Sequence, residues 1–446
     1  MKIKRIIAIF LILSVIVLSG CNHEIPSHDE TPTLDNTFTG EKPGYIIEPE
    51  PTTNDGLFEY VILKWKENKT ADLYEYADTE LSNLLNKNDF VYMFESVSEL
   101  GGTLNGFSDK QSSTSGGIVT YSAKLDFENI TADISVSFKN LKICAFTRNI
   151  RFKNTFEIYH KNNITEKHFV LENNGYKLNA IYTYVNDGQV HPAVLLIAGS
   201  GPSDYSETIG ILTPFEDIAL GLARNGINTL RVDKRTFNYA SEIEVDGGIE
   251  EEYLSDCNSA VDFLKNQNIS ELYLLGHSLG GQIAAELAVN DDDIDGMILF
   301  NSSARHLADI ACDQSVRLDP LNKALYTAYA DAAKGAAAST AKGYYYYGAS
   351  DYYWASYNHI DTARNISEAN IKTLIINSRF DNQIFAEDIN MWETLFADNE
   401  NVSICVYNDI SHFGYKIDTA DPAVFYKRTV FPNEVISEFS DFIKGN

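Results

Sequence analysis

Positive charge is scarce in this chain of 446 residues. The chain has 35 lysines and arginines against 63 aspartates and glutamates, which gives a formal net charge of −28. No basic patch rises above this acidic background, so the composition disfavours a nucleic-acid-binding protein and we expect no nucleic-acid partner. The acidity favours solubility but does not indicate a fold.

Cysteine is also rare, with five in the chain. Apart from Cys21, the cysteines are widely spaced and form no C-x-x-C pair: Cys144, Cys257, Cys312 and Cys405. This spacing does not suggest a zinc site, and we expect neither a metal nor an organic cofactor. Cys144 and Cys405 lie in apolar, strand-like runs, where buried free thiols are expected. The spacing alone does not decide whether a disulfide forms.

The first twenty residues differ in character from the rest. A basic start at residues 2–5 precedes the apolar run 6–18, and the segment Leu-Ser-Gly-Cys ends at Cys21. Such a pattern is typical of a secretory signal peptide rather than of a stable membrane span. Leu-Ser-Gly-Cys resembles the lipobox of bacterial lipoproteins, which implies cleavage before Cys21 and a lipid on that residue. The alternative is an uncleaved N-terminal anchor. Both interpretations place the body outside the cytoplasm and hold it to a membrane.

The chain is too long for one ordinary core, so two or three folded units are expected. Residues 22–56 are polar and hold five of the eleven prolines. They predict that 21–56 is an extended, disordered tether between the lipid and the first folded unit.

Residues 57–151 are expected to form a small α+β domain. Three segments with helical periodicity, the last ending at Gly101 and Gly102, precede short alternating segments typical of antiparallel strands. Helices followed by a curved sheet resemble the NTF2-like domains, long described as a domain of unknown function (DUF3887-like), that precede some secreted bacterial hydrolases. The resemblance implies a spacer, a dimerisation module or a substrate-presenting module. A homodimer is one expectation that follows.

Strands and helices alternate over residues 160–446. Apolar segments such as "AVLLIAG", "LYLLGH" and "GMILFN" alternate with amphipathic helical segments. This order predicts an α/β fold with a mostly parallel sheet covered by helices on both faces. An insertion at about 302–366, rich in alanine and tyrosine, interrupts the alternation and is expected to be a helical cap over the carboxyl edge of the sheet.

The segment Gly276-His277-Ser278-Leu279-Gly280 fits G-x-S-x-G and lies between a buried strand and a helix. In that context the serine sits on a strained turn, with positive φ, and its hydroxyl stands above the sheet. Glycines can also simply close a tight corner. The strand–turn–helix context favours Ser278 as a nucleophile.

A serine hydroxyl needs a base, and the base needs an acid to orient it. In this type of fold the acid and then the histidine follow the serine along the chain. His306 and His359 fall in the insertion, whereas His412 follows the last predicted strand. His412 is therefore the expected base.

Asp381 lies just past the strand that follows the insertion and is the expected acid. Three other carboxylates are alternatives for this role. Glu387 and Asp388 already lie in a predicted helix, and Asp409 is expected to stabilise a turn.

Acyl transfer also requires N–H donors for the oxyanion. The backbone N–H of Leu279 is one expected donor, and the second should come from the loop of residues 199–202 after "AVLLIAG". These glycines could equally form a plain strand-to-loop turn.

Residues 160–446 resemble α/β-hydrolases of the esterase, serine aminopeptidase and dienelactone-hydrolase-like group. "IAGSGPSD" is similar to that family's H-G-S-G-P-x-D, "RVDKR" to its R-y-D-k-R, and "SRFDNQI" to its G-x-x-D-x-Q-V. The resemblance implies that Ser278, Asp381 and His412 form the triad and that Ser200 is the second oxyanion donor. Two departures are present. Ala198 stands where the family has histidine, which predicts a looser oxyanion loop, and "RTFNYAS" replaces a glycine-rich continuation.

The expected function is a membrane-anchored, extracytoplasmic serine hydrolase that acts on small-molecule carboxylic esters. An aminopeptidase or amidase on the same triad is the first alternative, with Asp331 or Asp351 as candidates for binding a free amine. A binding lipoprotein with an inactive hydrolase domain is the second. Tyr353, Trp354 and Tyr357 are candidates for the wall of an acyl pocket. The sequence does not identify the substrate or the oligomeric state.

Overall fold

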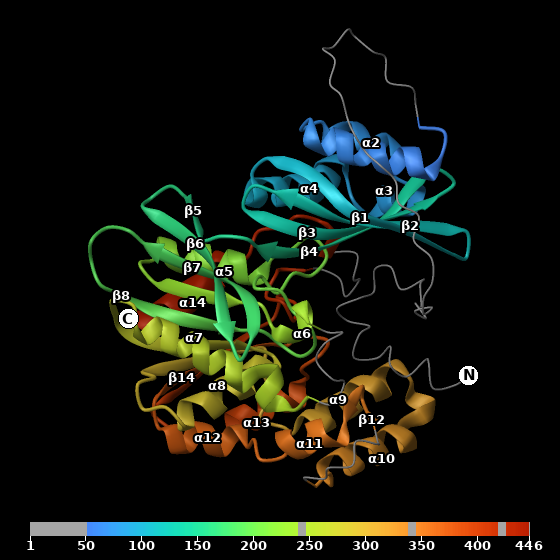
Figure 1. Ribbon diagram of the computed structural model, residues 1–446. Coiled ribbons are helices and arrows are strands. Elements are labelled where there is room, and N and C mark those ends of the chain that lie inside the picture. The colour runs from blue at the N-terminus through green and yellow to red at the C-terminus, as the bar shows by residue number, and fades with distance from the viewer. Residues whose placement is uncertain (1–50, 240–246, 338–344, 418–424, 446) are drawn as a thin grey trace. The chain divides into compact units, whose positions relative to one another are not determined.

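The computed structural model describes residues 51–239, 247–337, 345–417 and 425–445 (Figure 1). The expected signal peptide, Cys21 and nearly all of the expected tether lie outside these residues. Within them, none of the helices combines the length and the apolar character that a membrane span requires. The chain divides into two compact units between Ile150 and Arg151. We call residues 51–150 the N-terminal unit and residues 151–445 the C-terminal unit.

The N-terminal unit places helices on one face of an antiparallel sheet (Figure 1). Its helical elements are α2 (Asn54–Lys66), the 3₁₀-helix η2 (Thr70–Tyr76), α3 (Thr79–Leu84) and α4 (Lys87–Gly101). Its strands, in sheet order, are β1 (Leu104–Ser115), β2 (Ile118–Phe127), β3 (Ile130–Lys139) and β4 (Lys142–Phe152). Each strand therefore neighbours the next strand in the sequence.

An aromatic cluster forms the core of this unit. Trp65 on α2 is 1% exposed and packs against the rings of Phe94, Phe127 and Phe146. Its indole Nε1 donates a hydrogen bond to Ser98 Oγ at 2.8 Å, which satisfies the one polar atom of the ring. The helices are thus held on the sheet by burial of large aromatic side chains.

Two details of the N-terminal unit differ from the sequence-based expectation. The helical segment expected after α2 is split, because Ala77 is extended and Asp78 then caps α3 by accepting a hydrogen bond from the backbone N–H of Leu81. Strand β1 was not predicted, since its sequence is mostly polar and only Leu104 in it is buried. Strand β1 is stabilised by its backbone pairing with β2 and not by burial of an apolar face.

The C-terminal unit is built on a nine-stranded mixed sheet with the order β15-β14-β11-β10-β8-β9-β7-β6-β5. The first six strands in that order run parallel to one another, and the last three continue in antiparallel pairs. The strands are β5 (Phe156–Tyr159), β6 (Ile164–Asn173), β7 (Tyr176–Val185), β8 (His191–Ile197), β9 (Asn228–Val232), β10 (Ile269–His277), β11 (Gly296–Phe300), β14 (Lys372–Ser378) and β15 (Val402–Tyr407). The expected mostly parallel sheet is confirmed.

Helices cover both faces of this sheet. They are α5 (Pro214–Arg224), α6 (Arg235–Asn238), the π-helical turn η3 (Glu250–Leu254), α7 (Ser255–Lys265), α8 (Leu279–Val289), α13 (Ala386–Leu395) and α14 (Asn433–Lys444). Helices α5 and α14 pack together on one face, whereas α7 and α8 share the main apolar core with the cap. The central strands β8, β10 and β11 are almost wholly buried, as their continuous apolar runs predict.

The insertion contains α9 (Leu307–Leu318), η4 (Pro320–Asn322), α10 (Lys323–Lys334), β12 (Tyr345–Tyr346), β13 (Ala349–Ser350), α11 (Asp351–Tyr357) and α12 (Thr362–Ala369). It is not purely helical, because β12 and β13 form a hairpin. Tyr347 and Gly348 both have positive φ, as a two-residue hairpin turn requires. Helix α12 packs on α8, where Asn365 Nδ2 donates to Glu286 Oε2 at 2.7 Å. Residues 362–369 therefore belong to the helical layer rather than to the cap.

Candidate active site

Ser278 stands at a sharp turn between β10 and α8. Its backbone has φ 53° and ψ −121°, a conformation that costs a non-glycine residue about 1–3 kcal/mol. The neighbouring glycines make this turn possible. A Cβ atom at Gly276 would lie 2.0 Å from the carbonyl oxygen of Gly280, and one at Gly280 would lie 2.1 Å from that of Ile197. The serine itself is partly exposed, so its hydroxyl can meet a substrate.

His412 and Asp381 form a buried pair on two neighbouring loops. Asp381 follows β14 and His412 follows β15, and Asp381 Oδ2 lies 2.7 Å from His412 Nδ1. The other carboxylate oxygen of Asp381 accepts the backbone N–H groups of Gln383 and Ile384. Because the carboxylate is held at both oxygens, it fixes the imidazole with Nε2 as the nitrogen free to act on a substrate hydroxyl or water.

The histidine loop is joined to the serine turn through the backbone. The carbonyl oxygen of His412 accepts hydrogen bonds from His277 Nε2 at 2.8 Å and from Asn301 Nδ2 at 2.7 Å. The rings of His277 and His412 have centroids 4.6 Å apart. Among the described residues no hydrogen bond joins Ser278 to the His412 ring, and in unliganded sites such bonds are often long and tighten with substrate.

The loop after β8 lies against the serine. A Cβ atom at Gly199 would be 3.1 Å from Ser278 Cβ. The Gly199 carbonyl accepts hydrogen bonds from Lys234 Nζ at 3.1 Å and from the Tyr253 hydroxyl. In a trans peptide the N–H points opposite to the C=O, so these two side chains aim the Ser200 N–H away from themselves.

Within the described ranges, no hydrogen bond occupies either of the two expected oxyanion donors. Leu279 is the first residue of α8, where backbone N–H groups lack a partner within the helix. The Ser200 N–H has no acceptor among the residues that the structure describes, and Ser200 is exposed. Both N–H groups are therefore available to a substrate oxygen.

The segment "RVDKR" holds the loop of residues 199–208. Arg231 Nη1 donates to Ser206 Oγ at 2.9 Å, Asp233 Oδ1 accepts the Tyr205 N–H at 2.8 Å, and Lys234 Nζ donates to the Gly201 carbonyl at 2.7 Å. Burial lowers the pKa of Lys234, although the adjacent Glu252 carboxylate opposes this. The loop is thus held by several side chains, and its contacts do not show the loosening expected from Ala198.

The remaining carboxylates have other roles. Asp388 is fully buried and pairs with Arg305, and its Oδ2 accepts the Phe385 N–H at the start of α13. Asp409 is more than half exposed and pairs with Lys416. Asp331 is exposed beside Lys334. These contacts are local, whereas Asp381 alone among the acids considered contacts His412.

The aromatic residues proposed for an acyl pocket belong partly to the interior of the cap. Trp354 and Tyr357 are almost fully buried. Trp354 Nε1 donates to the Tyr346 carbonyl, and the Tyr357 hydroxyl donates to Gln282 Oε1 on α8. Tyr357 therefore joins the cap to α8, whereas the bond of Trp354 lies within the cap, and their place in a pocket wall stays a prediction.

The cysteines are free thiols in the part of the chain that the structure describes. Cys144, Cys257, Cys312 and Cys405 are all partly exposed rather than fully buried. Cys144 Sγ donates to the Ser137 carbonyl, so the strand position leaves the thiol at the rim of the core. Within the described ranges, no group of three or more His, Cys, Asp or Glu side chains is arranged to hold a metal ion.

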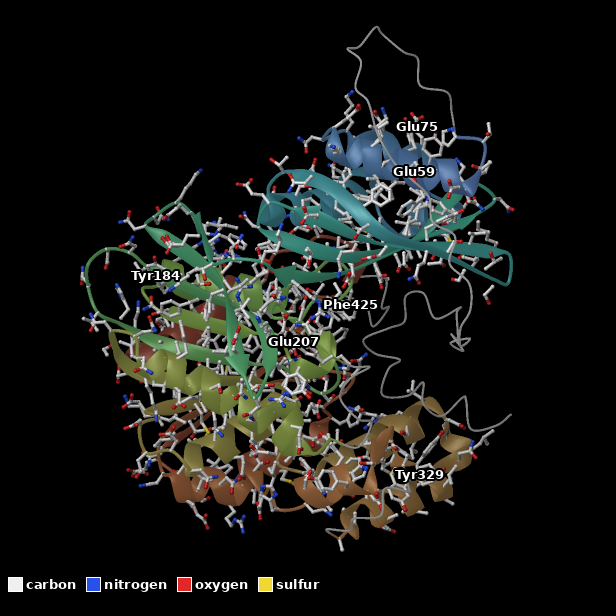
Figure 2. The ribbon with its side chains drawn as sticks, viewed as in Figure 1. Glu59, Glu75, Tyr184, Glu207, Tyr329 and Phe425 are labelled. Carbon is white, nitrogen blue, oxygen red and sulfur yellow. The ribbon has the colours of Figure 1, made fainter. Side chains whose placement is uncertain are left out.

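Sequence reasoning missed the buried side chains that support the site. Glu207, His277, Lys234, Tyr253 and Asn301 contact the loops that carry the expected catalytic groups (Figure 2 labels Glu207). Two signals were available, because His277 lies inside the G-x-S-x-G motif and Lys234 lies inside the segment "RVDKR". The partners of these residues are distant in the chain, and local sequence patterns do not predict contacts between distant residues.

Comparisons with known proteins give matches to part of this chain. Residues 209–376 match the family model described as serine aminopeptidase, S33. The chain is 31% identical over 254 residues to the esterase EstD of Thermotoga maritima, a match that covers 56% of this chain and 61% of that protein. The chain thus spans about three fifths of the length of this curated relative.

The solved structures that match part of this chain include two esterases. Est1E from Butyrivibrio proteoclasticus has a TM-score of 0.42 at 16% identity, covering 62% of this chain and 98% of that one. The Pyrococcus furiosus esterase Pf2001 has a TM-score of 0.41 at 15% identity, covering 66% and 98%. The family model and the Thermotoga relative thus each match part of this chain.

Proposed function

We propose that this chain is a serine hydrolase that cleaves small-molecule carboxylic esters through an acyl-enzyme. The observation that carries the proposal is the strained turn of Ser278 beside a buried His412–Asp381 pair, with the backbone of His412 bonded to the residue before the serine. The similarity to an esterase supports the same reaction class.

The proposed mechanism gives each group a role. Ser278 Oγ attacks the acyl carbonyl while His412 Nε2 takes its proton, and Asp381 stabilises the imidazolium that forms. The N–H groups of Ser200 and Leu279 stabilise the oxyanion. His412 returns the proton to the leaving alkoxide, and the same ring then activates the water that cleaves the acyl-enzyme and regenerates the serine.

An aminopeptidase on the same triad is the second candidate, because the matched family model carries that description. The substrate test compares a short-chain p-nitrophenyl ester with an aminoacyl p-nitroanilide on the full-length chain. We expect the larger kcat/KM for the ester. A clear preference for the amide would replace the esterase proposal. Labelling of Ser278 by a fluorophosphonate, whichever substrate is preferred, would show that the triad is intact.

We further propose that the protein is extracytoplasmic and anchored to the membrane by a lipid on Cys21. The basic start, the short apolar run and the segment Leu-Ser-Gly-Cys support this. Replacing Cys21 by serine is expected to move the protein from the membrane fraction to the soluble fraction, because one thioether-linked lipid is removed. Cys144→Ser is the matched control and should stay in the membrane fraction. Unchanged membrane association of the Cys21 variant would favour an uncleaved N-terminal anchor.

For the N-terminal unit we propose an NTF2-like module that presents substrate or mediates dimerisation and does not itself catalyse. Its helices on an antiparallel sheet support this assignment. The homodimer stays a prediction, which sedimentation of the full chain checks.

A further inference from the structure

His277, the residue before the nucleophile, has an acceptor oxygen at each ring nitrogen. Nδ1 lies 2.8 Å from Glu207 Oε1, and Nε2 lies 2.8 Å from the carbonyl oxygen of His412. A neutral imidazole donates from one nitrogen only, so two acceptors call for the doubly protonated ring. Glu207 Oε1 also accepts the Gly199 N–H at 2.7 Å, so this oxygen acts as an acceptor.

Burial and charge agree with this protonation state. His277 is 2% exposed and Glu207 is 7% exposed, so an unpaired charge on either would be costly. Burial by itself lowers the pKa of His277, but the Glu207 carboxylate and the two hydrogen bonds outweigh it and raise that pKa above its ordinary value. Asp381 also faces the ring with its negative charge and acts in the same direction.

The pair connects three parts of the site that are distant in the sequence. Glu207 holds the oxyanion loop through the Gly199 N–H, His277 is covalently next to Ser278, and the His277 ring holds the loop of His412 through its carbonyl. Glu207 itself has a φ of 51°, which its neighbours must enforce. One ion pair thus bridges the oxyanion loop, the nucleophile turn and the base.

We propose that Glu207 and His277 act as positioning residues, forming a buried carboxylate–imidazolium pair that sets the oxyanion donors and the triad histidine around Ser278. The inference rests on the proposed serine-hydrolase function. Neither residue touches the reacting atoms. Their effect is on the alignment of the transition state rather than on substrate binding, because the groups that they hold act when charge develops on the acyl oxygen.

The kinetic test replaces Glu207 by glutamine in the full-length chain. Glutamine keeps the size of the side chain but removes the charge that pairs with His277. We expect kcat for the ester to fall by about 10- to 100-fold, with KM changed little, since displacements of about 1 Å in a catalytic group have effects of this size. Asp256→Asn is the matched control. It neutralises another buried carboxylate, which pairs with Arg235 and does not contact Gly199, and should keep near wild-type kcat.

A direct measurement of the ring state keeps the inference testable even if the variants fold poorly. In ¹⁵N-histidine-labelled wild-type protein at neutral pH, both nitrogens of His277 should have the chemical shifts of protonated imidazolium. The resonance is assigned by its disappearance in His277→Gln. In Glu207→Gln the ring should become neutral.

Two outcomes would overturn the inference. One is a neutral His277 ring in the wild-type protein, and the other is a Glu207→Gln variant with wild-type kcat. Failure of the proposed function looks different: Ser278→Ala would keep its activity while the imidazolium shifts of His277 were still observed.

Discussion

Replacing Ser278 by alanine is expected to lower kcat for a short-chain p-nitrophenyl ester by about 10⁴- to 10⁶-fold. The reason is chemical: the acyl-enzyme cannot form without the hydroxyl, and what remains is the stabilisation that the Ser200 and Leu279 N–H groups give to direct attack by water. The fold should be unaffected, because Ser278 is partly exposed and alanine is smaller. Initial rates on the purified full-length chain measure the effect.

Ser440→Ala is the matched control for this substitution. Ser440 is a buried serine on α14 whose hydroxyl donates to the Ile436 carbonyl, away from the triad. It should retain wild-type kcat and lose at most about 1 kcal/mol of stability. Substantial activity in the Ser278 variant would reject Ser278 as the nucleophile.

Replacing Asp381 by asparagine is expected to lower kcat by about 10⁴-fold, with a smaller change in KM. In the wild type, Asp381 Oδ2 accepts a hydrogen bond from the Nδ1–H of His412, which leaves Nε2 free to act as the base. An asparagine can present an N–H to Nδ1 instead, which favours the wrong tautomer, and it cannot stabilise the imidazolium that forms during acylation. The pH–rate profile of the variant should show activity recovering at alkaline pH, where hydroxide replaces the missing base.

Asp409→Asn separates this role from a general effect of charge near the histidine. Asp409 is three residues from His412 in the sequence, but it is more than half exposed and pairs with Lys416. Exposed ion pairs contribute about 0–1 kcal/mol to stability, so the loss of the Asp409–Lys416 pair should disturb the fold little. We therefore expect kcat of this variant to stay within about twofold of wild type. A larger loss for Asp409 than for Asp381 would reassign the acid.

Local patterns were sufficient where structure depends on neighbours in the chain. The apolar runs of β8, β10 and β11 predicted buried parallel strands, and the glycines on either side of Ser278 predicted its positive φ. Prediction from hydrophobic periodicity failed where a strand is stabilised by hydrogen bonds to its neighbouring strand. Strand β1 is polar along most of its length and exists because β2 offers it backbone hydrogen bonds. The hairpin in the cap was missed for the same reason, since two strands of two residues show no period.

What the sequence determined by itself is the order of Ser278, Asp381 and His412 at predicted strand ends, and hence the reaction class worth proposing. Only the tertiary structure showed the contacts around them: His277 reaches Glu207 across 70 residues and the His412 carbonyl across 135. The physical reason is the distance in sequence between the residues that interact. A turn or a strand is selected by the residues within a few positions of it, whereas a buried charge is stable only beside the one partner that the completed fold brings to it.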